Sequence, residues 1–139
     1  MDHHPLSMEI LSEAAERLGN EPVVMINLLR FREKPLYEVG FDDGAKLTSR
    51  SAYYEGYAQA FQQIAEKLGV TSERVYIGSQ AMTLVSNEDE QWDDIVIVRY
   101  RSFADLRSII EHRDYKLKAE PHRQAAVKCW RFIASRSIP

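Results

Sequence analysis

The stretch Pro22-Val-Val-Met-Ile-Asn-Leu-Leu-Arg-Phe31 decides the fold, because it is apolar on both alternating sides of an extended chain. A second stretch, Asp94-Ile-Val-Ile-Val-Arg-Tyr-Arg101, has the same property as far as Arg99. Strands that are apolar on both sides lie in the interior of a sheet whose two faces are both covered. The two stretches are therefore predicted to be the central strands of one sheet.

Two helices are expected to cover this sheet. The first is predicted over residues 50–68, where Tyr54, Tyr57 and Phe61 recur at helical spacing. The second is predicted to begin after Ser102, whose hydroxyl can accept a hydrogen bond from the first turn. Each helix follows one of the two central strands along the chain.

The remaining segments complete the pattern. Outer strands are predicted over residues 74–85, with Gly78 as a bulge or close-approach point, and over residues 127–134. A short accessory helix is expected over residues 7–19. Residues 112–122, which Pro121 interrupts, are expected to be irregular with room for one helical turn.

The resulting order, a helix followed by β-α-β-β-α-β, predicts the α+β class and the ferredoxin-like fold, an antiparallel sheet with helices on one face. We expect one domain over residues 1–139, with an N-terminal helical extension at 1–21 and a long loop at 32–49. Two helices cannot cover both faces of the sheet, and monomers rarely expose a large apolar face. We therefore expect a homodimer packed sheet to sheet, with a dimer of dimers left open.

The charge pattern argues against nucleic acid and membrane partners. The net charge is −3 and the arginines are scattered without a basic block. The longest apolar runs, such as Ile95–Val98, are far too short to span a bilayer. Residues 1–5 lack the features of a secretory signal, so we expect a cytoplasmic location. Cys129 lies in an apolar segment and is interpreted as a buried, inert thiol.

The motifs predict no cofactor. Glycine-rich phosphate loops, P-loops and nucleophile elbows are absent from the sequence. The pair His3-His4 lies near the terminus, and no other histidine or carboxylate set has metal-ligand spacing. We expect neither a metal ion nor an organic cofactor.

Several stretches resemble a known family. They are Met25–Phe31, Trp92 leading into Asp94–Ser102, the run Ser102-Phe-Ala-Asp-Leu, Tyr115 and Arg123–Ala126. Through them, residues 23–134 resemble the family called domain of unknown function 1330, within the dimeric α/β-barrel superfamily. The resemblance implies a ferredoxin-like fold and a homodimer that forms a dimeric α/β barrel. Related proteins of the superfamily include cofactor-free monooxygenases, muconolactone-type isomerases and haem-degrading enzymes, so the fold alone dictates no activity.

Two polar residues interrupt the central strands. An unpaired amide at Asn27 would cost about 1–3 kcal/mol, so Asn27 either makes a structural hydrogen bond or donates into a cavity. A guanidinium at Arg99 would need a carboxylate or an anionic ligand. The register of the strands decides whether the two side chains share a face, and the sequence leaves it open.

The segment after the second covering helix concentrates groups that can transfer protons. His112 and His122 are candidate general bases near neutral pH, with Asp114 able to orient an imidazole. The alternative is a helix end in water, where the helix dipole favours His112. The superfamily resemblance favours His122, Arg123 and Tyr115, because this region borders the cavity between helix and sheet.

Tyr54 and Trp130 are further candidates for the wall of an aromatic ligand site. Tyr54 belongs to a tyrosine cluster at the start of the helix predicted over residues 50–68, and Trp130 lies on the strand predicted over residues 127–134. Packing in the core is the alternative interpretation for both side chains.

We weigh three functions. The first is a protein that binds a small aromatic or carbonyl-bearing acid and possesses cofactor-independent, monooxygenase- or isomerase-like activity as a further possibility. In that activity His122 or His112 would be the base, and Arg99 with Asn27 would stabilise the developing oxyanion. The second is a non-catalytic homodimer that binds a small metabolite, and the third is a purely structural homodimer. A closed cavity with an inward histidine favours catalysis, and a cavity without one favours binding.

Overall fold

A computed structural model describes residues 6–41, 44–86 and 90–139, so the pair His3-His4 lies outside the described residues. The helices are α1 (Met8–Leu18), α2 (Ser49–Ser51), the π-helical η1 (Ala52–Ala58), α3 (Gln59–Leu68), α4 (Phe103–Ile110), the π-helical η2 (Tyr115–Ala119) and α5 (Glu120–Ala126). The strands are β1 (Val23–Phe31), β2 (Ser72–Ser79), β3 (Asp94–Tyr100) and β4 (Val127–Ser135).

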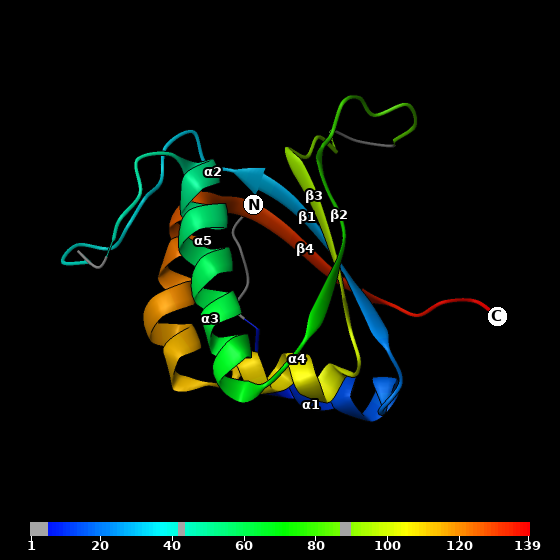
Figure 1. The fold of residues 1–139 in the computed structure, drawn as a ribbon. Coiled ribbons are helices and arrows are strands. Elements are labelled where there is room, and N and C mark those ends of the chain that lie inside the picture. The colour runs from blue at the N-terminus through cyan, green and yellow to red at the C-terminus, as the bar shows by residue number, and fades with distance from the viewer. Residues whose placement is uncertain (1–5, 42–43, 87–89) are drawn as a thin grey trace.

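The four strands form one antiparallel sheet in the order β2-β3-β1-β4. The two strands that are apolar on both sides, β1 and β3, are therefore central, as predicted. The helices lie to one side of the sheet, and the opposite face carries no element among the described residues (Figure 1). The α+β class and the ferredoxin-like arrangement are confirmed.

The two faces of the sheet differ in burial. On the helix side, Val23 and Leu29 are fully buried, and Asn27 opposite Val96 lies on this same side. On the other side, residues such as Ile26 and Ile97, which face each other in the register, are only half-buried. The helix side of the sheet is therefore the floor of the core.

The main helix is one continuous helical run from Ser49 to Leu68, which agrees with the expected span of 50–68. Thr48 and Ser51 form a reciprocal capping box at its start, and Gly69 ends it in the left-handed conformation. The π-helical turn η1 within this run was not expected from the sequence.

Strand β2 departs from its expected bounds of 74–85. It begins at Ser72 and ends at Ser79, which pairs with the first residue of β3, Asp94, and one further backbone hydrogen bond joins Gln80 to Asp93. The irregularity in the pairing lies between Arg74 and Tyr76 and not at Gly78. Gly78 is a close-approach point instead, because the Tyr76 ring occupies the space of a Cβ there.

Residues 112–122 are helical and not irregular, which corrects the sequence-based expectation. They form the turn η2 and the start of α5, and Pro121 lies in the first turn of α5. The helix is continuous at this point, because the Glu120 N–H bonds the carbonyl of Tyr115, and Pro121 contributes no backbone donor to it. The accessory helix α1 forms as expected, with Ser7 as its N-cap, and packs against α4.

Candidate ligand-binding cavity

A cavity of about 190 Å³ lies between η1–α3 and the helix side of the sheet. Six aromatic side chains line it: Tyr53, Tyr54, Tyr57, Phe61, Tyr100 and Phe132. The polar residues that line it are Asn27, Gln62, Ser72 and Arg74. Its wall therefore combines a large apolar surface with a small number of polar groups, as is typical of small-molecule sites.

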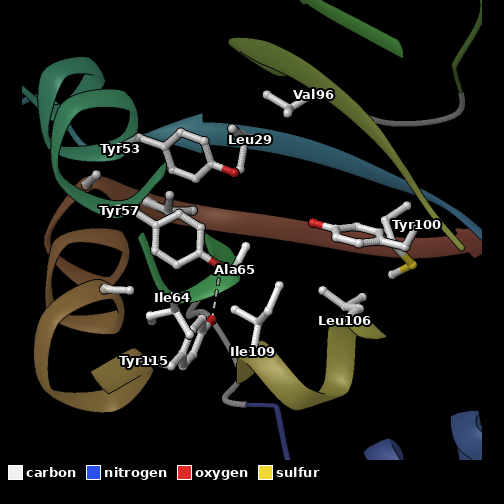
Figure 2. Packing of buried hydrophobic residues seen from close by; sticks show 14 of the residues in the cluster. Leu29, Tyr53, Tyr57, Ile64, Ala65, Val96, Tyr100, Leu106, Ile109 and Tyr115 are labelled. Carbon is white, nitrogen blue, oxygen red and sulfur yellow. Dashed lines mark hydrogen bonds between the residues drawn. The ribbon is translucent and has the colours of Figure 1, made fainter. Parts of the chain in front are cut away.

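The helical wall of the cavity is a row of rings. Tyr53, Tyr57 and Phe61 follow one another at a spacing of four residues, with centroids 5.3 Å and 5.8 Å apart. The four-residue spacing places these rings on one side of the helix, facing the sheet. The hydrophobic core continues beneath them (Figure 2).

The tyrosine hydroxyls have different partners. Tyr57 and Tyr115 share a hydrogen bond of 3.0 Å, and Tyr54 donates to Asp94 Oδ2 at 2.6 Å. The hydroxyls of Tyr53 and Tyr100 bind no partner among the described residues. Burial raises the pKa of Tyr53 and Tyr100 well above the ordinary value, so both hydroxyls stay protonated at neutral pH.

Asn27 lies on the floor of the cavity, but its amide is largely occupied. Its Nδ2 donates to the carbonyl of Val96 at 3.1 Å, and its Oδ1 accepts a hydrogen bond from Trp130 Nε1 at 3.0 Å. The interpretation of Asn27 as a structural hydrogen-bonding residue is therefore supported. Trp130 is a half-buried side chain that holds this amide and does not itself line the cavity.

Arg123 is fully buried behind the cavity wall. Its guanidinium lies over the Trp130 ring at 4.3 Å and over the Tyr57 ring at 5.8 Å. None of its nitrogens makes a well-formed hydrogen bond to a described residue, and the carboxylate of Glu120 is 3.5 Å from Nη2. Such a weakly paired buried cation creates a positive potential in its surroundings.

Asp94, at the start of β3, does not line the cavity but holds the hydroxyl of Tyr54, which does. It accepts hydrogen bonds from Arg50, Tyr54 and Ser79. Burial alone would raise the pKa of Asp94, but the hydrogen bonds from Arg50 and Tyr54 outweigh it and hold that pKa below its ordinary value. Asp94 is therefore ionised at neutral pH.

His122 does not face the cavity. It packs on the outer side of the main helix, where a Cβ at Gly56 would lie 2.5 Å from its ring. Tyr37 from the long loop lies 2.7 Å from its Nδ1. The Tyr37 oxygen accepts a hydrogen bond from the backbone N–H of Lys46, so its own hydrogen is available to donate to the imidazole.

His112 and Arg99 also lie away from the cavity. His112 is half-buried at the end of α4, where its Nδ1 accepts a hydrogen bond from the backbone N–H of Asp114. Arg99 pairs with Val24 in the register and is exposed on the other side of the sheet from Asn27. Asn27 and Arg99 therefore do not share a face, and the guanidinium expected to be buried at Arg99 is not.

Several residues of the cavity were missed by the sequence analysis. Tyr100 and Phe132 reach the cavity because they lie on the same side of the sheet as Asn27. Alternation along β3 places Tyr100 on the side opposite Arg99, which was the available signal. Arg74 reaches the wall only because of the irregular pairing in β2, and no sequence signal marks it.

Solved structures resemble this chain along its length. Two are crystal structures of the RPA0582 protein, described as a protein of unknown function from Rhodopseudomonas palustris. The methylated form has a TM-score of 0.81 and 28% identity, covering 100% of this chain and 98% of that one. The other has a TM-score of 0.80 and 27% identity, covering 100% and 99%.

A third structure is a dimeric protein of unknown function and ferredoxin-like fold from Bacteroides fragilis. It has a TM-score of 0.50 and 12% identity, covering 84% of this chain and 96% of that one. The fold is ferredoxin-like. No family model and no curated protein matches the chain.

Metal-ligand clusters and membrane-spanning helices are both absent from the described residues. No group of three histidine, cysteine, aspartate or glutamate side chains there could hold a metal ion. None of the described helices has the length and apolar content needed to cross a bilayer.

Proposed function

We propose that this chain forms a homodimer in which each subunit binds a small aromatic or carbonyl-bearing acid. The observation that carries the proposal is the aromatic cavity of about 190 Å³ between the main helix and the sheet. We also propose that the chain belongs to the domain of unknown function 1330 family. In this proposal it forms a dimeric α/β barrel and is located in the cytoplasm.

The size of the cavity limits the ligand. An engineered cavity of about 150 Å³ in another protein binds benzene. A volume of about 190 Å³ therefore fits one ring with a substituent of a few atoms. The row formed by Tyr53, Tyr57 and Phe61 supplies aromatic faces against which such a ring can pack.

The charges around the cavity favour an acid. Arg74 lines the cavity, and the buried guanidinium of Arg123 lies behind its wall. No carboxylate lines the cavity among the described residues. A negatively charged ligand would reduce the cost of keeping Arg123 buried and weakly paired.

The open face of the sheet supports the homodimer. In the register, Tyr76, Ile97, Ile26 and Ile133 form one row across all four strands. Tyr76 is 51% exposed and Ile133 is 45% exposed in the single chain. A second copy would cover the same row with its own, which gives a self-complementary apolar interface. The description of the Bacteroides fragilis neighbour as dimeric agrees with this arrangement.

The surroundings of the cavity favour binding over catalysis. Among the described residues, no imidazole, carboxylate or thiol lines it, and both candidate histidines lie elsewhere. The hydrogen bond of 2.6 Å from Tyr54 to Asp94 supports a second candidate, an isomerase-like proton transfer through the Tyr54 hydroxyl. Loss of turnover of a small acid in Asp94→Asn, with binding retained, would favour that second candidate.

A pair of alanine substitutions tests the proposed function. Ala58 lines the cavity, whereas Ala60 lies on the outer side of the same helix. Small acids with one ring or a 2-oxo group are titrated against the protein by calorimetry. We expect at least one acid to bind, Ala58→Leu to abolish binding by filling the cavity, and Ala60→Leu to leave it unchanged. Binding that survives Ala58→Leu, or no binding of any acid, would refute the proposal.

A further inference from the structure

Two buried tyrosine side chains have hydroxyls that make no hydrogen bond to a described residue, and both side chains line the cavity. Tyr53 is 4% exposed and Tyr100 is 5% exposed, and neither hydroxyl binds a described residue. Tyr53 comes from the helix and Tyr100 from the sheet, and their hydroxyls point toward each other across the space between these layers (Figure 2). Neither hydroxyl oxygen is an enclosed atom, so both can be reached from the cavity, and the pair indicates where a polar group of the ligand can bind.

A third donor lies close to these two. Tyr57 and Tyr115 have two hydroxyl hydrogens between them, and their mutual hydrogen bond uses one. The other hydrogen is available to donate. Tyrosine hydroxyls that stay protonated donate to oxygen acceptors, and a carboxylate has two oxygens with about four lone pairs to accept them.

The buried cation Arg123, which acts electrostatically on Tyr53, has the sign that this arrangement requires. The guanidinium of Arg123 lies behind the Tyr57 ring, on the side away from the main cavity volume. It always carries a positive charge, and Glu120 at 3.5 Å is its carboxylate neighbour among the described residues. An anionic oxygen beside the tyrosine hydroxyls would therefore lie in a favourable potential.

From these contacts we infer that the ligand is a monocyclic aromatic carboxylic acid bound with its carboxylate inward, between the hydroxyls of Tyr53 and Tyr100. We call these two residues the tyrosine clamp. The ring of the ligand then packs against Phe61 and Phe132. This inference rests on the proposed function and adds the ligand class and its orientation. The competing orientation places the carboxylate outward, at the exposed Arg74.

Four small molecules of nearly equal shape show whether binding depends on the carboxylate or only on a ring that fills the cavity. They are benzoate, benzamide, toluene and benzylammonium, each titrated by calorimetry at neutral pH. We expect benzoate to bind most tightly, benzamide next because it keeps one acceptor oxygen, and benzylammonium least because it brings a positive charge to a positive region. Benzoate binding no tighter than toluene would overturn the clamp.

Single hydroxyl deletions locate the carboxylate. Tyr53→Phe and Tyr100→Phe are each expected to weaken benzoate binding by about tenfold or more, because each removes a hydrogen bond to a charged group. Toluene binding should stay within about twofold in both variants, since no hydrogen bond to toluene is lost. Tyr76→Phe, on the opposite face of the sheet, is the matched control and should leave benzoate binding unchanged.

Arg74→Met distinguishes the two orientations. The inward orientation predicts a loss of less than about threefold, because an exposed, solvated charge contributes little. A large loss in Arg74→Met together with unchanged affinity in both clamp variants would overturn the inward orientation while leaving the cavity as an acid site. Failure of all four probes to bind would instead count against the proposed function itself. The first result would contradict only the inward orientation of the acid, whereas the second would contradict the binding of acids altogether.

Discussion

A guanidinium buried without well-formed hydrogen bonds, as at Arg123, contributes little to folding stability unless something else binds it. Its stacking on Trp130 at 4.3 Å offsets part of the cost of burial. The carboxylate of Glu120 is partly exposed and can be hydrated without its partner. At the scale of single residues, Arg123 is therefore better suited to an anionic ligand than to the stability of the empty fold.

Arg123→Met tests this interpretation. Methionine has a similar length and makes favourable contacts with aromatic rings, so we expect the free energy of unfolding to stay within about 1 kcal/mol of wild type or to rise. Affinity for the acid should fall by about tenfold, because a buried charge is removed. Urea denaturation and calorimetry measure the two quantities. A loss of stability above about 3 kcal/mol with unchanged affinity would identify a purely structural cation.

The carboxylate of Asp94 makes stability depend on pH. Hydrogen bonds from Arg50 and Tyr54 hold its pKa below the ordinary value against the effect of burial. A carboxylate with a lowered pKa stabilises the folded state above its unfolded pKa, and this contribution is lost as the pH falls through the folded pKa. Because Arg50 is half-exposed, the contribution is reduced by solvent screening.

Asp94→Asn should therefore destabilise the protein by about 1–2 kcal/mol at pH 7. The difference from wild type should begin to shrink below about pH 4, where the carboxyl of the unfolded chain becomes protonated, and should be lost as the pH falls through the lower pKa of the folded carboxyl. Urea unfolding of both proteins at pH 7 and pH 3 measures this difference. Equal differences at the two pH values would show that Asp94 acts through packing and not through its charge.

At the scale of elements, the π-helical turn η1 and the long loop are joined through His122. The imidazole lies directly against Gly56, and Tyr37 of the loop contacts its Nδ1 at 2.7 Å. The rings of Tyr37 and Phe41 both meet the imidazole edge to face. The structure therefore supports a role for His122 in holding the loop on the helix.

Gly56→Ala tests this packing. Alanine normally stabilises a helix relative to glycine, but its Cβ would lie 2.5 Å from the His122 ring. We expect a net loss of about 1–3 kcal/mol, because the ring must move and its contact with Tyr37 is disturbed. Urea denaturation measures the loss. Gln59→Ala, at an exposed position of the same helical run, is the control and should change stability by less than about 0.5 kcal/mol.

At the scale of the whole molecule, the free face of the sheet is the surface that we propose as the dimer interface. Ile97 lies at the middle of its apolar row, opposite Ile26. A charge introduced there would be solvated in a single chain but buried without a partner in a sheet-to-sheet dimer. Such a substitution therefore separates folding from association.

We expect the wild type to be a dimer and Ile97→Glu to be a folded monomer. Sedimentation at micromolar concentration measures the mass, and circular dichroism checks the fold. Leu117→Glu is the matched control, because Leu117 is 57% exposed on the helical side of the molecule, and it should leave the dimer intact. A wild-type monomer at that concentration would refute the proposed interface.

Most of the fold could be predicted from periodicity, and less of the site could. The helix over 50–68 was predicted correctly because its apolar residues stay on one side along its whole length. The two central strands were predicted correctly because they are apolar on both sides. Of the expected site residues, Asn27 and Tyr54 line the cavity, and Tyr115 and Arg123 lie just behind its wall. Tyr53 and Tyr100 face the cavity with free hydroxyls. Their role could not be predicted because they are far apart in the sequence and meet only in the folded structure.

The sequence by itself determined the element order and the central position of β1 and β3, because burial on both sides imposes a pattern on every residue of a strand. The tertiary structure alone decided which side chains meet. Shifting the pairing of β1 and β3 by one residue would place Asn27 and Arg99 on the same face without changing the sequence pattern of either strand. The helical path of residues 112–122 likewise depends on packing against the main helix, which overrides the weak local preference of a segment with an internal proline.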